Sequence, residues 1–227
     1  MQDKIYILLA GVNGAGKSTF YSVAAHFGKI FPFCDGDVFQ KLPLVNSDKF
    51  AKKLGDWKDS AVQREAAQIA VEMIKNCFAR GVSFSQETTL SGRAVLRNIN
   101  TAKKLGYKVG IIYIGVDSVD IAKERVRYRV ENGGHGIPEN LIETRYSSSF
   151  NNLNKIMSKC DGVYLLDNSS DKKLRAIAIY DGEKLNLKGD YVGLPNWVEK
   201  YIEVPIFNET KEHPSSKEDS FEHDEYE

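Results

Sequence analysis

Residues 11–18 read Gly-Val-Asn-Gly-Ala-Gly-Lys-Ser and satisfy the pattern G-x-x-x-x-G-K-[ST] at every required position. An apolar run over residues 5–10 precedes this stretch and an amphipathic segment follows it, which predicts a strand, a phosphate-binding loop (P-loop) and a helix. The glycines of such a loop let backbone N–H groups converge on phosphate oxygens at the positive end of the helix. We therefore expect a nucleoside triphosphate, ATP in our interpretation, to bind here.

Two side chains of this loop have specific chemical roles in the prediction. Lys17 is expected to reach the β- and γ-phosphates from a solvent-facing position, and the Ser18 hydroxyl is expected to bind Mg²⁺. The complete nucleotide site is expected to comprise Gly11, Asn13, Gly14, Ala15, Gly16, Lys17, Ser18 and Thr19.

Short apolar runs alternate with helical patterns along the chain, which is typical of an α/β fold with a parallel sheet flanked by helices. Strands are expected over residues 5–10, 31–34, 82–86, 109–114 and 163–166. Helices are expected over residues 17–27, 59–80, 93–105, 119–130 and 139–158. A short antiparallel hairpin is expected around Asp181-Gly182.

The length of 227 residues suits one domain, which we expect over residues 1–207, followed by an acidic tail over residues 208–227. The tail carries a net charge of −6 (two basic and eight acidic residues), so the zero net charge of the chain leaves +6 on the domain. Few apolar residues occur in the tail, which predicts disorder. A diffuse charge of +6 suits an anionic ligand but does not indicate nucleic acid.

Compartment and membrane association are constrained by what the sequence lacks. No apolar run approaches the roughly 20 residues of a membrane span, and the first apolar segment is too short for a signal peptide. Cys34, Cys77 and Cys160 are few and widely spaced, which fits neither a disulfide framework nor a C-x-x-C site. We expect a cytoplasmic protein.

A P-loop alone does not separate a kinase from a GTPase switch or an ABC-type ATPase, so other polar clusters must decide. Asp35 and Asp37 follow the expected strand 31–34, at the edge where open α/β sheets place active sites. A kinase needs a carboxylate to accept the proton of the acceptor hydroxyl, and Asp37 is the favoured base. The alternative is structural: Asp35-Gly36 forms a turn and Asp37 caps a short helix from Val38.

A second polar cluster follows the expected strand 82–86. Glu87, Thr88 and Thr89 combine a carboxylate with two hydroxyls, which suits a polyhydroxylated or amide-bearing acceptor. We expect these three residues to contact the substrate, with the Mg²⁺ shell as the alternative contact of Glu87.

The third cluster is basic. Arg125 and Arg129 are four residues apart and share one helix face, whereas Arg127 points away from them. The glycines after this helix predict a flexible lid over the transferring phosphate, with both arginines offsetting its charge. A solvated basic helix face is the alternative. His135 in the lid is expected either to bind phosphate or to hydrogen-bond the loop.

Taken together, these motifs resemble the zeta-toxin family over about residues 4–168. The matching segments are the P-loop, the Asp37 segment, Gln86-Glu87-Thr88-Thr89-Leu90-Ser91-Gly92 and the run from Arg125 to Tyr146 that contains Arg129, His135, Pro138, Ile142 and Arg145. The resemblance implies an adenylate-kinase-like P-loop fold and ATP-dependent phosphorylation of a UDP-activated amino sugar, typically the 3′-hydroxyl of UDP-N-acetylglucosamine.

By position, the resemblance assigns ATP and Mg²⁺ to Lys17 and Ser18 and the base to Asp37. It assigns the acceptor to Glu87 and Thr89, and it raises a separate antitoxin protein as a candidate partner. The segment departs from the family pattern at Asp35, where Asn is expected, and in the lid, where Gly-Gly-His replaces an additional arginine. Two other functions stay open: a kinase for a nucleotide or a nucleic-acid 5′-hydroxyl, and a non-catalytic nucleotide-dependent binding protein.

Overall fold

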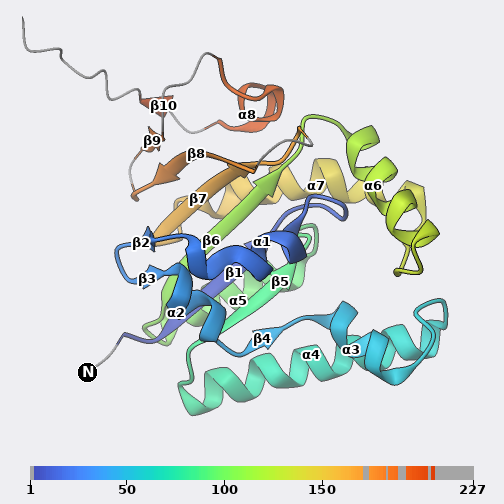
Figure 1. Ribbon diagram of the computed structural model, residues 1–227. Helices are drawn as coiled ribbons and strands as arrows, with labels where there is room; N and C mark the ends of the chain where they lie inside the picture. Colours follow the sequence, from blue (N-terminus) through green and yellow to red (C-terminus); the bar gives the residue numbers. More distant parts are fainter. Residues whose placement is uncertain (1–2, 171–173, 183, 189–192, 204–205, 208–227) are drawn as a thin grey trace, which may run out of the picture.

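The strand that leads into the P-loop lies in the middle of the main sheet. The computed structural model describes residues 3–170, 174–182, 184–188, 193–203 and 206–207. Its eight-stranded sheet has the order β10-β9-β8-β7-β6-β1-β5-β4 (Figure 1). The parallel part consists of β1 (Ile5–Ala10), β4 (Leu44–Val45), β5 (Phe84–Thr88), β6 (Lys108–Gly115) and β7 (Gly162–Asp167). All six residues of β1 are buried, as expected for a strand covered on both faces.

The predicted C-terminal hairpin is confirmed. β8 (Arg175–Tyr180) pairs antiparallel with β7 and with β9 (Leu185–Leu187), and the turn lies between β8 and β9. A short strand, β10 (Ile206–Phe207), runs parallel to β9. Helix α8 (Asn196–Tyr201) packs its buried Trp197 against Gly115, where an added Cβ would approach the indole within 2.3 Å.

The predicted helices occur close to their expected positions. They are α1 (Lys17–Val23) with a following 3₁₀ turn (Ala24–His26), α4 (Ser60–Arg80), α5 (Arg93–Lys104), α6 (Val119–Glu131) and α7 (Glu139–Met157). The helix over residues 59–80 was predicted from the helical spacing of its apolar residues, and the helix from Lys17 from its place directly after the P-loop. Within the described ranges, no helix is long and apolar enough to cross a bilayer.

The predicted strand at residues 31–34 is wrong. β2 (Lys29–Phe31) and β3 (Cys34–Asp35) form a separate antiparallel pair, and α2 (Gly36–Lys41) follows at once. Gly36 lets α2 begin directly against the 3₁₀ turn, because a Cβ there would lie 1.9 Å from the carbonyl oxygen of Ala24. Asp35 caps α2 by accepting a hydrogen bond from the Val38 N–H at 2.7 Å, so the cap belongs to Asp35 and not to Asp37.

The edge position of the sheet is taken by β4 instead, and β4 leads into α3 (Ser47–Leu54). Neither β4 nor α3 was predicted. A two-residue strand such as β4 is too short to show an alternating pattern of apolar residues. The expected disorder of residues 208–227 lies outside the described residues, and the domain boundary at residue 207 stays a prediction.

Candidate active site

The P-loop is shaped by two glycines with left-handed backbone. Gly16 caps α1 at φ 97°, and Gly14 has φ 83°. A Cβ on Gly14 would lie 2.4 Å from the carbonyl oxygen of Ala122, and one on Gly16 would lie 2.3 Å from Asn168 Nδ2. The loop therefore needs glycine at both positions to pack against α6 and the segment after β7.

Lys17 is buried at the base of the site, with 7% of the residue exposed, so the expected solvent-facing position is wrong. Its ammonium donates to the carbonyl oxygens of Gly11 at 2.8 Å and Val12 at 3.1 Å, and it lies 3.9 Å from Glu87 Oε1. Burial lowers the pKa of Lys17, and the Glu87 carboxylate opposes that shift. The P-loop itself thus holds the cation beside a carboxylate.

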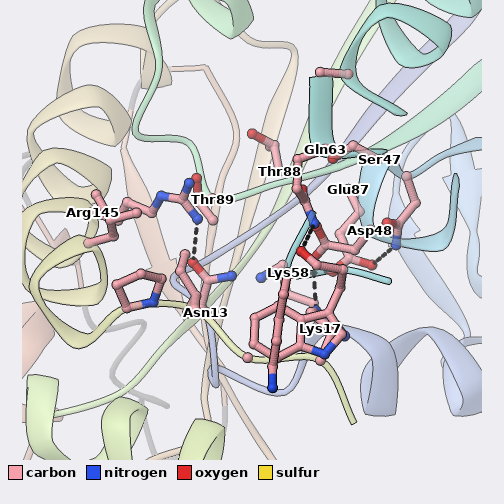
Figure 2. A pocket seen from close by; sticks show the side chains of 18 of the residues that line it. Asn13, Lys17, Ser47, Asp48, Lys58, Gln63, Glu87, Thr88, Thr89 and Arg145 are labelled. Atoms are coloured by element: carbon pink, nitrogen blue, oxygen red, sulfur yellow. Dashed lines mark hydrogen bonds and ion pairs between the residues drawn. The ribbon is translucent and has the colours of Figure 1, made fainter. Parts of the chain in front are cut away.

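One pocket of about 630 Å³ extends from Lys17 across the C-terminal ends of β4 and β5 (Figure 2). At the P-loop end the pocket is polar. Elsewhere it is bounded by Trp57 and Lys58 between α3 and α4, by Gln63 in the first turn of α4, and by Ile137, Pro138 and Leu141 around the start of α7. Its volume is within the usual range for small-molecule sites. The pocket can hold a ligand that reaches from the phosphates to the indole of Trp57.

Asp48 lies in the first turn of α3 and points into this pocket (Figure 2). Its Oδ2 lies 3.1 Å from His135 Nε2. That hydrogen bond is the main cause that lowers the pKa of Asp48; the charges of Lys17 and Arg129 act in the same direction, and burial opposes them. Asp48 is therefore held as a carboxylate.

Asn46 connects this carboxylate to the P-loop side of the site. Its Oδ1 accepts from the Lys49 N–H at 3.0 Å as the cap of α3, and its Nδ2 donates to Glu87 Oε2 at 2.7 Å. Glu87, Thr88 and Thr89 all line the pocket, as expected for polar residues at the end of a central strand. The structure thus brings the predicted β5 cluster together with Lys17.

Asp37 is not brought to the P-loop. It lies on α2, pairs with Lys41 at 2.5 Å and lines a different pocket, beside β2 and β3. The physical reason is that β2 and β3 pair with each other in a separate two-stranded sheet, which keeps this segment off the main sheet. The carboxylate that faces Lys17 from the α2–α3 region is Asp48.

The arginines of α6 divide as the helical spacing predicts. Arg125 and Arg129 line a second pocket of about 360 Å³ next to the P-loop. Arg125 Nη1 donates to the Asn168 carbonyl at 2.6 Å, and Arg129 Nε donates to the His135 carbonyl at 2.7 Å. Arg127 is exposed on the other face and pairs with Glu139 at 3.1 Å.

Some residues of the site were missed or left without a role. Arg145 belongs to the motif that carried the resemblance, and its Nη1 donates to Asn13 Oδ1 at 3.0 Å (Figure 2). Asp48 follows the apolar pair Leu44-Val45, and two apolar residues are too few to predict a strand. Trp57 lies in the loop before α4, and no sequence motif around it indicates a binding role.

The donor set fits Mg²⁺, which binds few protein oxygens and usually retains phosphate and water ligands. The exposed Ser18 hydroxyl and the Glu87 carboxylate line the 360 Å³ pocket together. In the described part of the chain, no three His, Cys, Asp or Glu side chains cluster closely enough to form a complete protein cage. Oxygen donors from the protein would therefore share the ion with the nucleotide.

Comparisons with known proteins agree with this arrangement. An uncharacterized protein of Haemophilus influenzae is 30% identical over 146 residues, which cover 64% of this chain and 94% of that protein. The crystal structure of AvrRxo1-ORF1 with ORF2 and ATP superposes with a TM-score of 0.60 at 17% identity, over 82% of this chain and 61% of that chain. This chain therefore spans less than two thirds of that longer structure.

A structure from the PezAT chromosomal toxin-antitoxin system of Streptococcus pneumoniae superposes with a TM-score of 0.54 at 15% identity, over 77% of this chain and 71% of that chain. At these identities the two structures establish the fold. The Zeta toxin family model matches residues 2–183. The chain, with its P-loop fold, belongs to the zeta toxin family.

Proposed function

We propose that this chain is an ATP-dependent kinase that phosphorylates a hydroxyl of a UDP-activated amino sugar, the 3′-hydroxyl of UDP-N-acetylglucosamine in the first instance. The observation that carries the proposal is that Lys17 and Asp48 line one pocket. A phosphate-binding lysine and an ionised carboxylate in one cavity are the two groups that transfer to an alcohol needs.

The proposed reaction uses the residues of both pockets. Lys17 and the P-loop N–H groups hold the β- and γ-phosphates of ATP. Asp48 accepts the proton of the acceptor hydroxyl. At the same time the acceptor oxygen forms a bond to the γ-phosphorus, and the bond between that phosphorus and ADP breaks. Arg125 and Arg129, which line the pocket beside the P-loop, offset the charge of the transferring group.

Mg²⁺ would be held by Ser18, with Glu87 as a further oxygen donor, and would neutralise negative charge on the phosphates when bound. ATP as the nucleotide is supported by the similar AvrRxo1-ORF1 structure that contains ATP.

The acceptor half of the pocket supports a nucleotide-sugar. Glu87, Thr88 and Thr89 offer hydrogen bonds to sugar hydroxyl and amide groups at the P-loop end. The indole of Trp57 and the ammonium of Lys58 at the far end suit a flat base and a diphosphate. A toxin role with a separate antitoxin partner is proposed from family membership and from the PezAT toxin-antitoxin system.

The test is incubation with ATP, Mg²⁺ and a panel of UDP-sugars, followed by mass spectrometry for addition of one phosphoryl group. The Lys17→Ala variant controls for a contaminating kinase. Phosphate on a nucleoside or polynucleotide 5′-hydroxyl, with none on UDP-sugars, would replace the proposed acceptor. ATP binding without acceptor-dependent ADP release would refute the kinase function and favour a nucleotide-dependent binding protein.

A further inference from the structure

The loop between α6 and α7, residues 132–138, is folded back onto Arg129, and we refer to it as the lid. The Gly134 N–H donates to the Arg129 carbonyl at 2.8 Å, and Arg129 Nε donates to the His135 carbonyl at 2.7 Å. A Cβ on Gly134 would lie 2.5 Å from Arg129 Cγ, so this fold of the lid requires glycine. Arg129 therefore fixes the backbone on both sides of the His135 amide.

With its backbone held by Arg129, the lid contacts α3 and the loop between α3 and α4 at two points. His135 Nε2 lies 3.1 Å from Asp48 Oδ2, a contact between residues 87 positions apart. One residue later the backbone packs on Trp57, because a Cβ on Gly136 would lie 2.9 Å from the indole Cη2. Both contacts depend on the lid lying over the pocket.

The donor in the hydrogen bond between His135 and Asp48 follows from the ionised state of the carboxylate. An ionised carboxylate only accepts hydrogen bonds, so His135 Nε2 must carry the proton and donate it. Among the described residues no other group hydrogen-bonds Asp48, so Oδ1 is left for an incoming hydroxyl. The imidazole thus orients one carboxylate oxygen and leaves the other available.

We propose that His135 is a positioning residue that couples lid closure to the base: its imidazole orients the Asp48 carboxylate only while the lid lies over the pocket. The inference rests on the proposed kinase function. In the transfer step the acceptor proton goes to Asp48 Oδ1, the acceptor oxygen bonds to the γ-phosphorus, and the bond to ADP breaks. His135 keeps its own proton throughout, and the base is active only with the lid closed over the acceptor.

Other charged groups around Asp48 contribute to its ionisation and must be kept constant in any test. Lys17 and Arg129 lower the pKa of Asp48, as His135 does, and burial raises it. The remaining charged side chains that line the two pockets are Lys49, Lys52, Lys58, Glu87, Arg125 and Arg145. A variant at His135 leaves all of these in place.

The experiment compares wild type with His135→Ala, His135→Gln and the control His26→Ala, whose side chain is exposed in the 3₁₀ turn after α1. Rates are measured against acceptor, ATP and pH. For His135→Ala we expect a fall in kcat of about tenfold or more, because a misplaced base is inefficient, with the KM for ATP unchanged. We also expect the acid limb of the kcat/KM profile to move to higher pH.

His135→Gln retains an N–H donor and should recover most of the lost kcat, which a purely structural role for the ring would not give. Equal kcat and an unmoved acid limb in His135→Ala would overturn the proposal. So would an equal loss in His135→Gln with no shift of the acid limb.

A second measurement needs no turnover and separates this inference from the proposed function. Carboxyl resonances of ¹³C-labelled aspartate are titrated in wild type and His135→Ala, with Asp48→Asn identifying the Asp48 signal. An upward shift of the Asp48 pKa in His135→Ala supports the coupling even if no acceptor is phosphorylated. An unchanged titration overturns it even if the kinase function is established.

Discussion

Replacing Asp48 by Asn tests the assignment of the base most directly. Asn keeps the size of the side chain and an oxygen that accepts from His135, but it does not take up a proton. General-base assistance is worth about 10²- to 10⁴-fold in rate, which corresponds to about 3 to 5 kcal/mol of activation free energy. We expect kcat to fall by that factor while ATP binding is retained.

The cost in stability should be much smaller. The Asp48 side chain is 41% exposed, so its contact with His135 is screened by solvent and stabilises the fold by at most about 1 kcal/mol. Its place in the first turn of α3 adds a helix-dipole contribution of about 0.3–1 kcal/mol. A chain of this size loses about 2–4 °C in Tm for each kcal/mol, so Asp48→Asn should melt only a few degrees lower.

The pH dependence of this contribution follows from the lowered pKa of Asp48. Because the folded-state value lies below the unfolded one, the stabilisation is complete above the ordinary carboxyl range near pH 4 and is lost as the pH falls through the folded pKa. The Tm difference between wild type and Asp48→Asn should therefore be constant near neutral pH and shrink in acid.

Single-turnover phosphotransfer, ATP affinity and thermal melting are measured for Asp48→Asn and for the matched control Asp37→Asn. Asp37 is exposed, pairs with Lys41 and lines a separate pocket, so its variant should keep the wild-type rate. A crippled Asp37→Asn beside a normal Asp48→Asn would refute the reasoning and return the base to α2.

Three further substitutions examine the nucleotide and acceptor halves. Lys17→Ala should abolish productive ATP binding in calorimetry and also lower the Tm by several degrees, because Lys17 is buried and its loss leaves the carbonyls of the P-loop without donors; unchanged ATP affinity would contradict this. Arg129→Ala should reduce kcat more than ATP affinity, and the exposed Arg127→Ala should reduce neither; equal losses would disprove the proposed face. Trp57→Ala should raise the acceptor KM about tenfold with the ATP KM unchanged, as expected from loss of one aromatic contact; an unaffected acceptor KM would remove Trp57 from the site.

The sequence alone was sufficient for the features that depend on neighbouring residues. The P-loop is contained in eight consecutive positions, and its glycines are required by local backbone geometry and by close packing of the loop. The long helices were predicted because their apolar spacing repeats over many positions, and the hairpin after β8 was predicted from the turn dipeptide Asp181-Gly182. The separation of Arg127 from Arg125 and Arg129 followed from the helical repeat in the same way.

The choice of carboxylate could not be predicted in this way. Asp37 and Asp48 carry nearly the same local signal, since each follows a short apolar run and lies in the first turn of a short helix. They differ because β4, and not residues 31–34, joins the edge of the sheet, where Leu44 pairs with Ser85 and Val45 with Gln86.

That pairing brings Asn46 within hydrogen-bonding distance of Glu87 and directs Asp48 toward Lys17 and His135. Strand pairing of this kind is a contact between distant parts of the chain, and its energy depends on which segments fit side by side. Only the tertiary structure decides it, because two residues of strand contain too little local information to specify their partner.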